Sequence, residues 1–147
     1  MKIAYTAEDL KDHHAIGVII TNKQGEILVQ KHVKYGFWTI PVGKVKQEQK
    51  VEEALREEMQ EECNIEVRSW EEIATKTYVY ERNGKNVTVP LHLFQIFSFE
   101  GIIKNNEPHN HTTQIFLPIE KIKELPYLSD ATLLFLETKG IYRTKSI

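Results

Sequence analysis

Three glutamates, Glu58, Glu61 and Glu62, are spaced so that a single helix would bring their carboxylates together. Residues three and four positions apart are neighbours on a helix surface, and like charges placed there repel one another. A hard divalent cation removes that repulsion, because Mg²⁺ and Mn²⁺ prefer oxygen ligands. The spacing therefore indicates a metal site, although basic side chains from elsewhere in the chain could also neutralise such a cluster.

The apolar residues of segment 51–62 indicate which way the glutamates point. With about 100° between successive residues of a helix, the apolar side chains gather on one stripe, formed by Val51, Ala54, Leu55 and Met59. Glu58 and Glu62 fall inside that stripe, and Glu61 flanks it. A carboxylate turned toward the protein core is costly unless it is paired, so these positions argue against a merely solvated acidic face.

The elements that must position this helix are mostly predicted strands. Runs of β-branched and aromatic residues predict strands at 15–21, 26–30, 37–40, 65–68, 72–80, 85–89, 91–99 and 114–117. Asn83-Gly84 between two of them is typical of a type I′ hairpin turn. A short helix at 119–125 and a last helix at 131–139, capped by Ser129, are also predicted. This order indicates an α+β fold class with a mixed β-sheet between helices.

The whole chain, residues 1–147, has the composition of one ordinary globular domain. Its formal net charge of −2 gives no basic excess for binding nucleic acid or an anionic membrane. The first residues lack the apolar run of a signal peptide, and no stretch reaches the roughly 18 apolar residues of a membrane span. Cys63 is the single cysteine, so no disulfide can form within the chain. We therefore expect a cytoplasmic protein that binds neither nucleic acid nor membrane.

Residues 43–65 resemble the Nudix box of the Nudix hydrolase family, in its MutT-like form. The family pattern runs from a Gly through a Glu, an Arg-Glu pair, an apolar residue and a Glu-Glu pair to a second Gly. In this register the matching residues are Gly43, Glu58, Met59, Glu61, Glu62 and Ile65. The segment 38–44 is similar to the residues that lead into the box. Three positions depart: Gln49 stands for Glu, Glu57 for Arg and Asn64 for Gly.

The resemblance implies the Nudix fold, an α/β/α sandwich, and hydrolysis of a nucleoside diphosphate linked to another group. It implies that Glu58, Glu61, Glu62 and the carbonyl of Val42 hold Mg²⁺ or Mn²⁺. Such a metal would neutralise pyrophosphate oxygens and activate a bound water. For the general base that takes the proton of this water, Glu58 or Glu61 is the first choice, and Glu107 is the alternative from a later loop.

The three departures from the family pattern have physical interpretations. Asn64 is a mild change, because Asn is the next-best residue after Gly for a left-handed helix cap. In the family, the first Glu and the Arg brace the loop against the helix. Here we expect the Gln49 amide to donate a hydrogen bond to Glu57 instead. The alternative is that both side chains are exposed and the brace is lost, which would loosen the metal site.

Several neighbouring residues have two open interpretations each. Lys44 could hold substrate phosphates or be a solvated lysine at the end of a loop. Trp38 and Phe37 could stack on a base or pack in the core. Gly43, the first residue of the box, is expected to support the site structurally.

Three further residues carry reactive groups but have simpler interpretations. His109 and His111 have a spacing that could bind a transition metal, but without a third His or Cys nearby a surface loop is favoured over zinc. Cys63 has no neighbouring His in the sequence, so a packed thiol is favoured over a nucleophile.

The substrate class is indicated only by resemblance. The segment leading into the box is most like that of members that act on (d)NTPs, including damaged nucleotides. Dinucleoside polyphosphates come second, because such members tend to have a tyrosine near the position of Tyr80. A Nudix-fold domain that binds a nucleotide without hydrolysing it is the alternative from another functional class, favoured by Gln49 and Glu57. Family members are often dimers, so a homodimer is a possible assembly.

Overall fold

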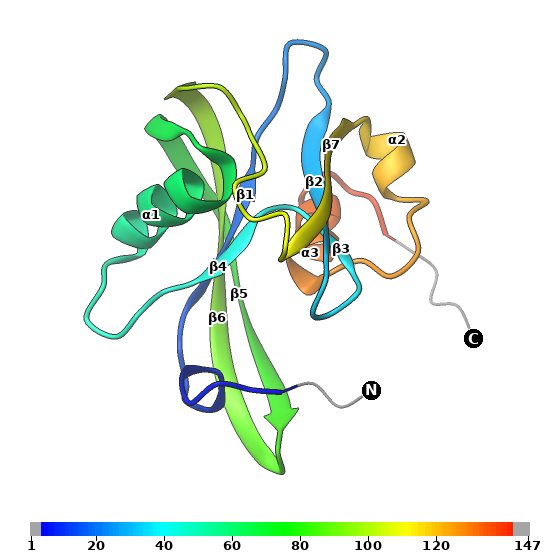
Figure 1. Cartoon of the computed structure of the whole chain (residues 1–147). Coiled ribbons are helices and arrows are strands. Elements are labelled where there is room, and N and C mark those ends of the chain that lie inside the picture. The colour runs from blue at the N-terminus through cyan, green and yellow to red at the C-terminus, as the bar shows by residue number, and fades with distance from the viewer. Residues whose placement is uncertain (1–3, 143–147) are drawn as a thin grey trace.

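Two long antiparallel strands, β5 (Glu66–Arg82) and β6 (Lys85–Glu100), form the largest element of the fold. The predicted turn joins them, and Asn83 and Gly84 both have positive φ, 52° and 76°, as a type I′ turn requires. The turn end of this hairpin extends beyond the rest of the molecule (Figure 1). The hairpin can therefore supply one wall of a cavity beside the body of the domain.

The computed structural model describes residues 4–142, so both ends of the predicted domain 1–147 lie outside the described residues. The other strands are β1 (Ala15–Ile19), β2 (Ile27–His32), β3 (Trp38–Thr39), β4 (Val42–Lys44) and β7 (His111–Leu117). One sheet has the order β4-β1-β6-β5 and the other has the order β3-β2-β7. β1 is parallel to β6 and antiparallel to β4, so the larger sheet is mixed, as predicted.

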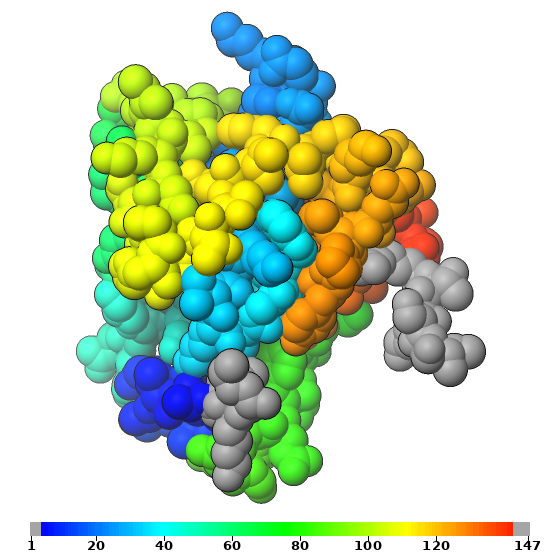
Figure 2. All heavy atoms as spheres, turned by 45° about the vertical axis from the view of Figure 1, so that its right-hand side comes forward, coloured from blue at the N-terminus to red at the C-terminus, as the bar shows by residue number. Residues whose placement is uncertain are grey.

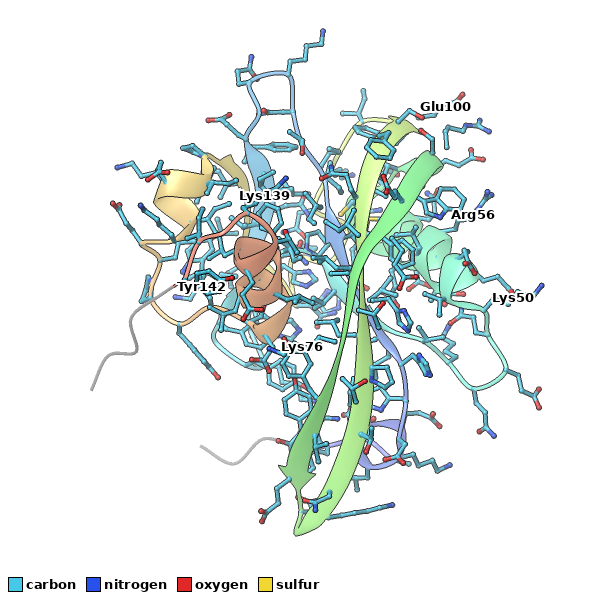
Figure 3. All side chains as sticks on the ribbon, turned by 180° about the vertical axis from the view of Figure 1, so that it is seen from behind. Lys50, Arg56, Lys76, Glu100, Lys139 and Tyr142 are labelled. Carbon is cyan, nitrogen blue, oxygen red and sulfur yellow. The ribbon has the colours of Figure 1, made fainter. Side chains whose placement is uncertain are left out.

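The helices are α1 (Val51–Cys63), α2 (Ile119–Ile122) and α3 (Asp130–Thr138), with a 3-10 turn η1 (Glu8–Leu10) near the N-terminus. Alternate side chains of β1 separate two cores: Ile16 packs on the α1 side, with Met59, and Ile19 packs on the α3 side, with Phe135. Figure 3 shows Arg56 of α1 and Lys139 after α3 on opposite sides of the hairpin. The predicted α+β class and α/β/α sandwich are confirmed, with the strands divided between two sheets.

Local sequence signals account for how the helices begin and end. Asn64 follows α1 with φ 63° and ψ 33°, so it is the left-handed cap that the sequence predicts. The Ser129 side chain accepts a hydrogen bond from the Thr132 backbone N–H and caps α3. α3 lies close to β1 because Gly17 has no side chain; a Cβ there would lie 3.2 Å from the Cβ of Ala131. Within residues 4–142, no helix is long and apolar enough to cross a membrane.

Candidate active site

A cavity of about 370 Å³ lies beside the C-terminal half of α1. Glu58 and Glu62 of α1 line it together with Gly43 of β4, Glu107 of the loop between β6 and β7, and His111 of β7. Residues from three separate parts of the chain therefore meet here. Figure 2 shows the segment around residues 104–116 packed over the segment around 31–40 on the same face.

Glu62 is the most deeply buried carboxylate of this cavity, with 2% of its surface exposed. Its Oε1 accepts a hydrogen bond of 3.0 Å from the Gln30 side chain, whose own oxygen accepts one of 3.2 Å from Gln114. Its Oε2 is buried and has no hydrogen-bond partner among the described residues. One oxygen is thus fixed by the protein, and the other is available to a ligand.

Two carboxylates of this cavity, Glu58 and Glu62, have raised pKa values. Burial raises the pKa of Glu62 well above its ordinary value, and the neighbouring Glu58 raises it further. Burial also raises the pKa of Glu58, and the negative charges of Glu61 and Glu107 add to the effect. Several carboxylates crowded in a buried site favour a cation.

The box residue Gly43 is in direct contact with Glu58. A Cβ at position 43 would overlap with Cγ and Cδ of Glu58 and would lie 2.9 Å from its Oε2. Glycine is therefore required here by the close approach of a side chain to the strand. The expected structural support from Gly43 has this contact as its physical basis.

Hydrogen bonding between β4 and β1 indicates where the Val42 carbonyl points. The Val18 N–H donates to the Pro41 carbonyl, and the Val45 N–H donates to the His14 carbonyl. Because the direction alternates along a strand, Val42 points its carbonyl away from β1. The carbonyl therefore faces the open edge of the sheet, since β4 is an edge strand.

The structure places Glu61 on the outside of the site and His111 inside it. Glu61 is exposed and is not among the residues that line the cavity. His111, expected on a surface loop, is only 3% exposed. A ligand atom of His111 lies within 4.8 Å of ligand atoms of Glu62 and Glu107. The surface-loop interpretation of His111 is therefore wrong: β7 begins at this residue and carries its side chain inward.

The brace that Gln49 and Glu57 were expected to form is present. The Gln49 side chain donates a hydrogen bond of 3.2 Å to Glu57 Oε2, and its oxygen accepts one of 2.9 Å from the Lys46 backbone. Lys46 also forms an ion pair with Glu57. The loop therefore supplies the cation and the helix supplies the acid, which reverses the charges of the family pattern.

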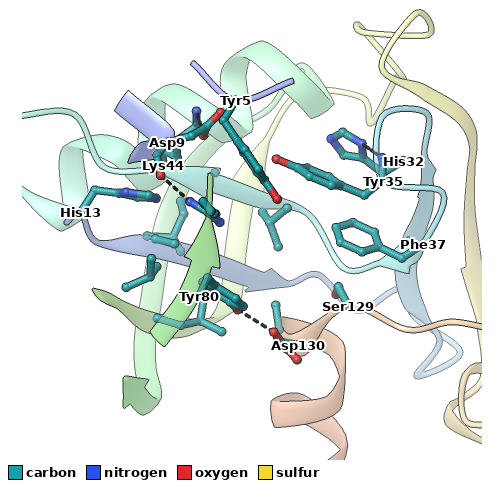
Figure 4. A pocket seen from close by; sticks show the side chains of 18 of the residues that line it. Tyr5, Asp9, His13, His32, Tyr35, Phe37, Lys44, Tyr80, Ser129 and Asp130 are labelled. Carbon is teal, nitrogen blue, oxygen red and sulfur yellow. Dashed lines mark hydrogen bonds and ion pairs between the residues drawn. The ribbon is translucent and has the colours of Figure 1, made fainter. Parts of the chain in front are cut away.

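A second cavity, of about 460 Å³, adjoins the first. His32, Val42, Gly43 and Lys44 are among the residues that line both. Its walls carry aromatic rings from separate segments: Tyr5, Tyr35, Phe37, Tyr80 and Tyr127. Figure 4 shows several of these rings around the open space. The rings of Tyr35 and Phe37 stack with centroids 5.1 Å apart, and Tyr127 meets Phe37 edge-on at 5.9 Å.

Comparison with known proteins identifies the family of this chain. The family model of the NUDIX domain matches residues 11–135. The chain belongs to this family.

Solved structures similar to this Nudix hydrolase include other members of the family. A MutT NUDIX hydrolase from Burkholderia pseudomallei has 27% identity and a TM-score of 0.71, over 86% of this chain and 97% of that one. The E. coli ORF135 protein has 23% identity and a TM-score of 0.70, over 92% and 94%. An Ap4A hydrolase from C. elegans has 22% identity and a TM-score of 0.62, over 87% and 96%. No curated protein sequence matches the chain.

The Nudix hydrolase holds Lys44 in an ion pair, so this side chain is not a freely solvated lysine. Its partner is Asp9, of which 2% is exposed. Burial alone would raise the pKa of Asp9, but the hydrogen bonds and charge of Lys44, with hydrogen bonds from Thr6, outweigh it and lower the pKa to about 2. Lys44 thus bears its charge at the junction of the cavities, already neutralised by a carboxylate.

Of the two aromatic residues considered for base stacking, only Phe37 lines a cavity. Trp38 packs against the core on the α3 side and lies under Lys31, 6.0 Å from the ring centroid. Within the described part of the chain it lines neither of the two cavities. The structure thus argues against Trp38 as a substrate contact and favours its neighbour.

His32 is a residue of the junction that the sequence did not single out. Its Nδ1 accepts hydrogen bonds from the backbone N–H groups of Lys34 (3.1 Å) and Tyr35 (3.4 Å). Burial, helped by the charges of His111 and Lys34, lowers the pKa of His32 to about 4. The ring is therefore neutral near pH 7, and its proton is on Nε2.

Proposed function

We propose that this Nudix hydrolase cleaves nucleoside triphosphates, ribo or deoxy and including damaged ones, in a reaction that depends on Mg²⁺ or Mn²⁺. The observation that carries the proposal is the junction of the two cavities. The aromatic cavity suits a nucleobase, because every base presents a π-face on which rings can stack. The carboxylate cavity begins where the phosphates of such a nucleotide would lie.

The residues of the carboxylate cavity fit a divalent cation. Glu62 directs a buried oxygen without a partner among residues 4–142, and Glu58 and Glu107 line the same space. We assign the cation to Glu62, Glu58 and Glu107, with the outward carbonyl of Val42 as a further oxygen and Glu61 at the exposed rim. A divalent metal, when bound, neutralises phosphate oxygens and lowers the pKa of a bound water.

The side chains of the protein bind the nucleotide and accept the proton of the attacking water. The rings of Phe37, Tyr35 and Tyr127 hold the base, and Nε2–H of His32 donates to a phosphate or ribose oxygen at the junction. Water attacks phosphorus, and a carboxylate takes its proton. We assign this proton to Glu58, which contacts Gly43 of the strand that leads into the site. Glu107, which lines the same cavity, is the alternative.

The test is release of pyrophosphate or phosphate from a panel of NTPs, dNTPs, dinucleoside polyphosphates and ADP-ribose, with Mg²⁺ and with Mn²⁺. Glu62→Gln should lower kcat/KM by about 1,000-fold, since a metal supplies several kcal/mol of transition-state stabilisation. Glu52→Gln, on the exposed side of the same helix, is the matched control and should retain the wild-type rate. Glu107→Gln, assayed at a saturating metal concentration, separates the two assignments of the base, because loss of turnover under that condition would favour Glu107.

Dinucleoside polyphosphates are the second candidate substrate. Tyr5 and Tyr80 also line the aromatic cavity, and Arg82 lies over them at 5.3 and 4.9 Å from their ring centroids. This leaves stacking surfaces for more than one base. A higher kcat/KM for dinucleoside polyphosphates than for any NTP would make them the substrate class. No turnover of any compound with either metal would instead favour a nucleotide-binding domain without hydrolysis.

A further inference from the structure

His111 is a buried histidine that the proposed reaction does not use. Its side chain is 4% exposed, and its Nδ1 is buried without a hydrogen-bond partner among the described residues. Its Nε2 lies 3.5 Å from Glu62 Oε1, which is too long for a strong hydrogen bond. That oxygen already accepts from Gln30 at 3.0 Å. The protein therefore leaves both ring nitrogens poorly satisfied.

The same site contains a second buried atom without a partner, Glu62 Oε2. A buried polar atom without a partner destabilises the folded protein, so each of these two atoms is better satisfied when a ligand is bound. Both belong to the cluster of Glu62, Glu107 and His111, in which one ligand atom of each residue lies within 4.8 Å of the others. A single cation bound by these three residues would give a partner to Glu62 Oε2 and to a ring nitrogen of His111.

The backbone holds the His111 ring in this place. Its N–H donates to the Glu107 carbonyl at 2.9 Å, and its carbonyl accepts from the Asn105 side chain at 2.7 Å. β7 pairs it with His32 of β2, and the two rings meet edge-on with centroids 5.3 Å apart. The imidazole is therefore positioned before any ligand arrives, which is how selective metal sites are built.

We propose that His111 supplies a nitrogen ligand beside Glu62 and Glu107, so that the site selects Mn²⁺ or another divalent transition-metal ion over Mg²⁺. The inference rests on the proposed metal site and names its ligand set. Mg²⁺ prefers an octahedral shell of oxygen ligands and water, whereas imidazole suits transition metals. Affinity at a mixed nitrogen and oxygen site rises from Mn²⁺ toward Cu²⁺ along the first transition row.

Pulsed electron paramagnetic resonance of the protein loaded with Mn²⁺ alone tests this directly. Coordinated imidazole should give ¹⁴N modulations in the wild type, and labelling with ¹⁵N-histidine should replace them by the ¹⁵N pattern. His111→Gln should lose the histidine signal, and His109→Gln, an exposed histidine of the same loop, should retain it. Titrations with Mn²⁺ alone and Mg²⁺ alone should show the preference for Mn²⁺ falling by about tenfold or more in His111→Gln only.

Two outcomes overturn the proposal: a wild type that binds Mn²⁺ without histidine modulations, or a His111→Gln protein that keeps them. The isotope experiment needs no variant, so it decides the matter even if His111→Gln fails to fold. It is also separate from the proposed function. A protein that ligates Mn²⁺ through histidine but turns over no nucleotide would refute only the proposed hydrolysis. Nucleotide turnover without the nitrogen signal would refute only the assignment of His111 as a metal ligand.

Discussion

The carboxylate cavity and the aromatic cavity adjoin, but the protein builds them in different ways. Glu62 and His111 are buried, and Gly43 leaves no space beside Glu58. The aromatic rings come instead from the N-terminal segment, the hairpin and loops, and one of them, Tyr127, is 63% exposed. A site that performs chemistry needs fixed positions, whereas loops and exposed rings can vary to suit a substrate. We therefore expect substitutions in the carboxylate cavity to abolish the reaction and substitutions in the aromatic cavity to change the substrate preference.

After Glu62→Gln, the largest effect should come from Gly43→Ala. The new methyl group would displace Glu58 from its place against β4, and small misplacements of catalytic groups reduce rates by about 100-fold. Steady-state hydrolysis should show this loss in kcat/KM. Gly25→Ala is the control, because it adds backbone strain at φ +79° in a turn where nothing lies within 4 Å. An unchanged rate in Gly43→Ala would mean that the position of Glu58 is unimportant.

A smaller and more selective effect is expected for Phe37→Ala. Removing one stacking surface should raise KM for nucleotides by about tenfold, since stacking contributes about 1–3 kcal/mol per base. Inorganic tripolyphosphate, which has no base, should be unaffected, and comparing the two substrates measures the difference. Phe97→Ala, at a 62% exposed position of β6, is the control. An equal loss with both substrates would show that Phe37 acts on the fold and not on the base.

The junction between the two cavities should contribute a pH-dependent stability. The folded pKa of Asp9, about 2, lies below its ordinary value of 3.8. Its stabilising contribution is therefore complete above about pH 4 and is lost as the pH falls through 2. Asp9→Asn should lower the free energy of unfolding by about 1–2 kcal/mol at pH 7 and by little at pH 2. Urea unfolding at both pH values checks this. A difference in the free energy of unfolding between the wild type and Asp9→Asn that stays constant with pH would contradict it.

The smallest effect is expected at the brace of the loop. A double-mutant cycle with Gln49→Ala and Glu57→Ala should give a coupling free energy of about 0.3–1 kcal/mol, because the pair is partly exposed. Urea unfolding measures the coupling, and Mn²⁺ titration should show a change in affinity of only about threefold or less. A cycle between Gln49 and Glu52, which lies on α1 as Glu57 does, is the control. No coupling between Gln49 and Glu57 would mean that the hydrogen bond does not stabilise the loop.

Features encoded within a few residues were predictable from the sequence alone. The limits and apolar stripe of α1, the left-handed cap at Asn64 and the hairpin turn at Asn83-Gly84 each depend on neighbours in the chain. Even the hydrogen bond between Gln49 and Glu57 follows from two positions on one loop and one helix. Local periodicity and backbone preference decide such features, because their partners are already close along the chain.

The tertiary structure alone decided which distant residues meet. The pairing of β2 with β7 brings His111 beside Glu62 and Gln30, although no pattern around residue 111 marks it as buried. Adjacent residues alternate along a strand, so Trp38 packs in the core while Phe37 lines the cavity. The sequence by itself determined a helix of carboxylates and the loop that braces it. Long-range strand pairing supplied the nitrogen beside those carboxylates and the rings around the substrate, since register between distant strands is fixed only when the cores pack.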